Sequence, residues 1–138
     1  MARLSIQKYR DMKINSAENA DPYELVQMVL KAILGKLAAA KACIEQKNIP
    51  EKGRLISECI TLIGSLDESL DMEQGGDISR NLSDLYNFCS GHLIASNVEN
   101  DTKKIDDVYQ IIGTIKEAWD EIPKQTRDEY LEKKVANR

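Results

Sequence analysis

The sequence has few of the aromatic residues that favour β-sheets and few of the Gly and Pro residues that are typical of fibrous and disordered proteins. Aromatic residues make up 5% of its 138 residues, and it has 7 Gly and 3 Pro. Strands favour aromatic and β-branched residues, whereas disordered and fibrous chains are rich in Gly and Pro. The abundant residues are instead Leu, Ile, Ala, Lys and Glu, which favour helices. The composition therefore predicts one folded all-α domain.

Long apolar runs and an excess of positive charge are also missing. No stretch approaches the ~20 apolar residues of a bilayer span, and residues 1–10 lack the apolar core of a signal peptide. The net charge is −4, whereas binding the phosphates of nucleic acid needs a basic patch. We therefore expect a cytoplasmic protein with no membrane insertion and no nucleic-acid partner.

The residue patterns of catalytic and metal sites are absent as well. His92 is the single histidine, and the positions three and four before it hold Cys89 and Phe88 instead of carboxylates at metal-ligand spacing. A di-iron bundle would need Glu-x-x-His pairs on facing helices. Cys43, Cys59 and Cys89 fall among aliphatic residues, which predicts buried thiols and no disulfide. We expect no enzyme activity, no metal and no cofactor.

Start and stop signals divide the chain into helices. Asp21 can cap a first helix, and Pro22 suits its first position because the missing N–H costs nothing there. Pro50 opens a second helix, and the glycine pair within residues 73–77 predicts the turn before a third helix, with Asp77 as its cap. The predicted helices span residues 22–46, 50–72, 77–96 and 101–122.

Connections of about five residues join these helices, so sequence neighbours must pack antiparallel. The sequence predicts an up-down-up-down four-helix bundle over residues 21–122. An extended or partly helical N-terminal segment, residues 1–20, precedes the bundle as a candidate cap for a groove. A charged tail, residues 123–138, follows it.

The apolar stripes of these helices are wider than a single core needs. On the second helix the apolar residues cover roughly 160° of the circumference, whereas a surface helix needs about 100°. Either the bundle closes tightly over this surface, or a groove remains for an amphipathic guest helix. Either the predicted helices simply tolerate the glycines inside them, or these glycines let another helix approach closely. The glycines are Gly35, Gly64, Gly91 and Gly113.

The run from Ser65 to Tyr86 resembles the FliS family of flagellin export chaperones. Its signature residues across the turn between helices two and three match here at Leu70-Asp71-Met72-Glu73, Gly75-Gly76, Ile78, Asn81-Leu82 and Leu85-Tyr86. Further matches, from Tyr9 to about residue 121, include Pro22-x-Glu24-Leu25, Asn100-Asp101 and Glu117-Ala118-Trp119.

This resemblance implies an antiparallel helical fold that binds the C-terminal segment of flagellin, keeps it from polymerising in the cytoplasm and presents it to the flagellar export gate. It also implies that the chaperone's own N-terminal segment covers part of the apolar surface when the guest is absent. Tyr9 and Ile14 match the spacing of the family's N-terminal Tyr and Val.

The expected mechanism is burial of a guest helix in a groove of the bundle, with either a monomer or a homodimer as host. The alternative is a structural bundle that self-associates through its excess apolar surface and has no dedicated client. The candidate anchors for the guest are apolar residues of the second and third helices: Ile56, Ile60, Ile63, Leu82, Tyr86 and Leu93.

Overall fold

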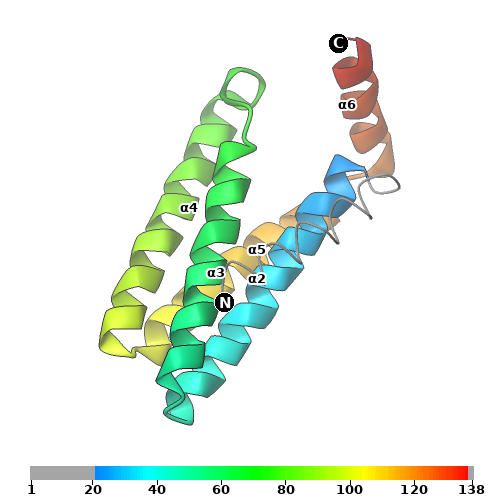
Figure 1. The fold of residues 1–138 in the computed structure, drawn as a ribbon. Helices are drawn as coiled ribbons and strands as arrows, with labels where there is room; N and C mark the ends of the chain where they lie inside the picture. The colour runs from blue at the N-terminus through cyan, green and yellow to red at the C-terminus, as the bar shows by residue number, and fades with distance from the viewer. Residues whose placement is uncertain (1–20, 137–138) are drawn as a thin grey trace.

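The computed structural model describes residues 21–136, with side chains up to Lys133. This part of the chain is helical and contains no strand, which confirms the predicted all-α fold (Figure 1). Its elements are α2 (Pro22–Glu45), α3 (Ile49–Glu68), α4 (Met72–Glu99), α5 (Thr102–Asp120) and α6 (Lys124–Ala136).

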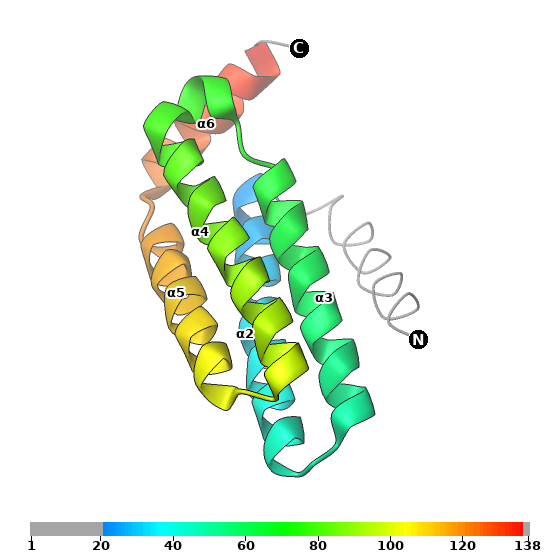
Figure 2. The same ribbon diagram turned by 90° about the vertical axis from the view of Figure 1, so that its left-hand side faces the viewer.

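Helices α2 to α5 form the antiparallel four-helix bundle that the sequence predicts. α2 packs against α3 and α5, and α4 packs against the same two helices, so the four form a closed ring around one core. Figure 2 looks onto α4, with α3 and α5 on either side of it. α6, in the predicted tail, extends beyond the end of the bundle (Figure 1).

The core is built from one apolar side of each bundle helix. Its residues are mostly aliphatic, and burial of such side chains is the main favourable term in folding. The largest fully buried apolar side chains are Leu30, Ile33, Leu37, Ile56, Ile63, Leu93, Ile105, Ile112 and Val108.

Aspartates start three of the four bundle helices. The Asp21 carboxylate accepts a 2.8 Å hydrogen bond from the Glu24 N–H, and Asp101 accepts one of 2.9 Å from the Lys103 N–H. These bonds satisfy donors that have no partner within the helix. They explain why the predicted starts at residues 22 and 101 lie within one residue of the observed ones.

The predicted turn between the second and third helices is wrong in its position. α3 already ends at Glu68, and Asp71 caps α4 by accepting hydrogen bonds from the N–H groups of Glu73 and Gln74 at 3.1 and 3.0 Å. The glycine pair therefore lies inside α4, where Gly76 (φ 48°, ψ −123°) interrupts the helix. The chain turns earlier because Asp71 caps a short first part of α4, but the positive φ of Gly76 interrupts the helix at the predicted glycine pair, and the long part of α4 follows from Asp77.

Two glycines should respond to alanine in opposite directions. At both Gly35 and Gly76 an added Cβ meets no atom within 4 Å, but only Gly76 has a positive φ. We expect Gly35→Ala to raise the free energy of unfolding by about 1 kcal/mol. Gly76→Ala should lower it by about 1–3 kcal/mol, because the backbone there is strained for other residues. Urea unfolding measures the free energy of unfolding of both variants. Changes of the same sign in the two variants would contradict this prediction.

Candidate partner-binding face

The six anchors predicted within the bundle all come from α3 and α4, which pack against each other. Ile56, Ile63, Tyr86 and Leu93 belong to the buried core, where each is at most 4% exposed. Ile60 and Leu82 are partly buried and pack against that core. The structure thus brings the six together, and their contact with a guest stays a prediction. Tyr9 and Ile14 lie outside the described residues.

The exposed apolar side chains that could touch a partner directly lie mainly on α4. Sequence reasoning did not choose them as anchors, because a helical stripe does not tell which of its edges faces the core. On α4 they are Met72, Ile78, Leu85, Phe88, Ile94 and Val98, with exposed fractions of 43%, 72%, 40%, 51%, 56% and 78%.

A lack of charge is the sequence signal that marks this part of α4. From Leu85 to Val98 the chain has no Asp, Glu, Lys or Arg, although such residues make up 30% of the whole sequence. On α3 the same holds from Cys59 to Leu66. Exposed helix surfaces normally carry charges, so uncharged stretches on two adjacent helices indicate a surface with another use.

Contacts within the bundle define which side of each helix this surface occupies. Lys52 of α3 donates a 2.8 Å hydrogen bond from Nζ to the Asn97 carbonyl of α4. Ile94 lies one turn before Asn97 and so projects on the same, α3-facing side. In contrast, His92 reaches Asp107 of α5 at 3.2 Å, and Phe88 stacks on His92 with ring centroids 4.8 Å apart.

We call the surface between these helices the uncharged face. It combines uncharged polar and apolar positions of α3 and α4 at helical spacing. Its residues are Ser57, Ile60, Thr61 and Gly64 of α3, with Asn87, Ser90, Ile94 and Val98 of α4.

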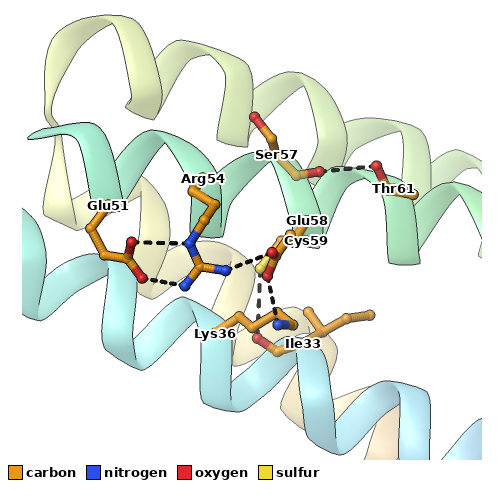
Figure 3. Close-up of polar contacts among 8 residues, drawn as sticks. All are labelled: Ile33, Lys36, Glu51, Arg54, Ser57, Glu58, Cys59 and Thr61. Carbon is orange, nitrogen blue, oxygen red and sulfur yellow. Dashed lines mark hydrogen bonds and ion pairs between the residues drawn. The ribbon is translucent and has the colours of Figure 1, made fainter. Parts of the chain in front are cut away.

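Two hydroxyl groups of α3, those of Thr61 and Ser65, bond back to their own helix. Thr61 donates a 3.1 Å hydrogen bond to the Ser57 carbonyl, and Ser65 donates one of 3.2 Å to the Thr61 carbonyl. Figure 3 shows Ser57 and Thr61 on the side of α3 away from α2. Because these hydroxyls already have partners, covering them with another molecule leaves no donor unsatisfied.

A cluster of charges on α3 faces α2, whereas Lys52 of the same helix bonds to α4. Glu58 is 1% exposed, and its carboxylate accepts a 2.6 Å hydrogen bond from Lys36 and a 2.7 Å bond from Arg54 (Figure 3). Arg54 is also paired with Glu51, and this bond raises the pKa of the guanidinium. A buried carboxylate needs such partners. The cluster joins α2 to α3.

A second cluster joins the bundle to α6. Tyr23 and Trp119 stack with ring centroids 5.7 Å apart, and the Trp119 indole N–H donates a 3.1 Å hydrogen bond to the Tyr23 carbonyl. Arg127 of α6 lies 4.1 Å from the centre of the Tyr23 ring. Near this end, between α2 and α3, an apolar hollow is lined by Pro22, Leu25, Val26, Val29, Ser65, Leu66 and Ser69.

Reactive chemistry is not evident in the described residues. The three cysteines are buried and free, as predicted. Burial raises the pKa of Cys59 to about 12 and that of Cys89 to about 11, so neither thiol is ionised at neutral pH. In residues 21–133 no three His, Cys, Asp or Glu side chains are placed to hold a metal ion. No helix of this range has the length and apolarity that crossing a membrane requires.

The fold is an antiparallel four-helix bundle with exposed apolar side chains on α4. A family model described as flagellar protein FliS matches residues 5–126. The flagellar secretion chaperone FliS of Vibrio cholerae is 40% identical over 88% of this chain and 90% of its own length. The flagellar secretion chaperone FliSB of Pseudomonas aeruginosa is 36% identical over 88% of this chain and 97% of its own.

A solved structure of a bacterial flagellar chaperone has the same fold. Its TM-score is 0.68 at 14% identity, and the match covers 83% of this chain and 94% of that chain. The extent of the family match and the identity to these relatives show that this chain belongs to the FliS family. The family resemblance predicted from the sequence is therefore confirmed.

The Glu58 cluster yields a stability prediction. Glu58→Gln keeps the size of the side chain but removes the charge that pairs with Lys36 and Arg54, so we expect a loss of about 1–3 kcal/mol. The matched control is Glu68→Gln at an exposed position of the same helix, which should change stability by less than about 0.5 kcal/mol. Chemical denaturation measures both, and equal effects would show that the buried pairs add nothing.

Proposed function

We propose that this protein is a chaperone for flagellin. It binds the C-terminal helical segment of flagellin in the cytoplasm, prevents premature polymerisation there and delivers the segment to the flagellar export gate. Membership of the FliS family supports this proposal, as do the relatives named flagellar secretion chaperones. The proposed role is binding, with no catalytic step.

The observation that carries the proposal is the exposed apolar surface of a bundle whose core is already complete. Ile94 and Val98 are more than half exposed, although Leu93, directly before Ile94, is fully buried. An amphipathic helix covers such a surface by laying its own apolar side on it. Of the six sequence-predicted anchors, Ile60 and Leu82 are partly exposed and contact the guest, whereas the other four support them from the core.

Self-association is the second candidate function, and it is favoured by the same exposed side chains. A second copy of this chain would bury Ile94 and Val98 as a guest helix does. Sedimentation equilibrium without peptide separates the two functions. A mass that rises with concentration and does not respond to flagellin would favour the structural bundle.

The flagellin prediction is tested with a peptide from the C-terminus of the same organism's flagellin. Isothermal titration into the full chain should give saturable binding with a negative heat-capacity change, because apolar surface is buried. In circular dichroism, the helix signal of the mixture should be larger than the sum of the signals of the protein and the peptide alone. Absence of both heat and added helix at high peptide concentration would refute the proposed client.

The N-terminal segment enters the proposal as a cap. Residues 1–20 precede the bundle, whose first helix begins at Pro22. We expect Tyr9 and Ile14 to cover part of the apolar surface that the guest occupies and so to compete with the guest. Removing residues 2–20 should then tighten binding of the flagellin peptide, whereas the double variant Lys8→Gln with Lys13→Gln, which keeps the apolar residues, should not. Unchanged or weaker affinity of the truncated chain would reject the cap.

A further inference from the structure

We propose that the stacked rings of Tyr23 and Trp119 form a binding site for an arginine of a basic partner segment, and that Arg127 of α6 occupies this site within the same chain. The site lies at the end of the bundle where α2 begins and α5 ends (Figure 1). The exposed apolar residues lie mainly on α4 instead. The inference therefore goes beyond the flagellin proposal and does not rest on it.

The first observation is the aromatic stack itself. The two ring planes are 15° from parallel, with their centroids 5.7 Å apart. Hydrogen bonds fix both side chains, because the Trp119 indole N–H donates to the Tyr23 carbonyl at 3.1 Å and the Tyr23 hydroxyl donates to the Asp120 carbonyl at 3.0 Å. The face of an aromatic ring attracts cations, and a planar guanidinium also stacks on it. Rings held in place this way are a preformed site for arginine.

A guanidinium group is seated on this stack. The Cζ atom of Arg127 lies 4.1 Å from the centre of the Tyr23 ring. Its Nε is buried and has no hydrogen-bond partner among the described residues. A buried N–H without an acceptor is costly, so the occupant from the same chain leaves part of its hydrogen bonding unmet. A partner arginine that also finds an acceptor would bind better than Arg127 does.

The charges around the stack favour a cation as well. α5 has no basic residue in its last turn, although a helix C-terminus is partly negative and favours one. Lys116, one turn earlier, pairs with Asp120 at 2.6 Å, and this bond lowers the pKa of the Asp120 carboxyl. Glu117 and Glu121 flank Trp119 in the sequence, and both are exposed. Their negative charge attracts a basic segment to this end of the bundle.

α6 is lightly attached and can give way to a partner. Within residues 124–133, only Arg127 and Leu131 are partly buried, and the others are exposed. α6 has 13 residues, a length at which an isolated helix is marginal in water. The family model ends at residue 126, so the two rings lie inside the matched range and Arg127 lies beyond it. The site thus belongs to the bundle, and α6 is an addition that fills it.

The test uses a hexa-arginine peptide as the probe and the fluorescence of Trp119, the only tryptophan of the chain, as the signal. Titration into the full chain should change the emission saturably. Arg127→Gln should bind the peptide at least ~3-fold more tightly than the unmodified chain, because the competitor within the chain is gone. The matched control, Lys124→Gln, removes the same charge from an exposed position of α6 and should have a smaller effect.

Two variants of Tyr23 test the ring. Tyr23→Leu should weaken binding of the peptide by ~10-fold or more, because the aromatic face is lost. Tyr23→Phe keeps the ring without its hydroxyl and should bind like the unmodified chain. Thermal unfolding checks that both variants fold. A hexalysine peptide tests the same point on the unmodified chain, and it should bind more weakly than hexa-arginine because an ammonium group does not stack on a ring.

Hydrogen exchange measures the displacement of α6 directly. When hexa-arginine saturates the unmodified chain, the backbone amides of residues 128–136 should exchange faster, because a helix that has lost its anchor opens more often. The amides of the bundle core should keep their exchange rates.

Each contrary result overturns a stated part of the proposal. Equal binding of hexa-arginine and hexalysine, or binding that a folded Tyr23→Leu variant retains in full, would show attraction to negative charge alone and overturn the site. Absence of binding to Arg127→Gln would do the same. Equal affinities of Arg127→Gln and Lys124→Gln, or unchanged exchange in α6, would overturn its occupation by Arg127. None of these results bears on binding of the flagellin peptide, which is measured separately.

Discussion

The buried carboxylate of Glu58 is the interaction on which the packing of α3 against α2 depends. It is stable in the core region because Lys36 and Arg54 both bond to it. On the other side of α3, Ser57, Thr61 and Gly64 are uncharged. The polar cluster thus fixes which side of α3 faces α2, since leaving a buried charge without a partner is costly.

Local signals predicted the parts of the fold that local interactions decide. Asp21 and Pro22 start α2 as expected, because a cap and a first-turn proline act within a few residues. The turn after α3 was misplaced because two adjacent signals competed there: the Asp71 cap and the glycine pair. Both signals act: the Asp71 carboxylate accepts from two N–H groups at the start of α4, and Gly76 interrupts the helix five residues later.

The candidate site, too, could be predicted from the sequence only in part. Periodicity placed Ile56, Ile63, Tyr86 and Leu93 on apolar stripes, and these four proved to be core residues. The edge of a stripe that stays exposed depends on how neighbouring helices are rotated, and a sequence pattern does not contain that rotation. Ile94 shows this plainly, because it follows the buried Leu93 and yet is 56% exposed. The uncharged run from Leu85 to Val98 was readable in the sequence as a second signal.

The sequence by itself determined that the chain is all-helical, that four helices form an antiparallel bundle, and that the chain resembles the FliS family, because helix propensity, short connections and a family signature are local properties. The tertiary structure alone decided that α6 extends past the bundle and that Ser57, Ile60 and Ile94 share one uncharged face. These features arise from packing between residues far apart in the chain. The free energy of burying each side chain depends on neighbours that only the folded bundle supplies.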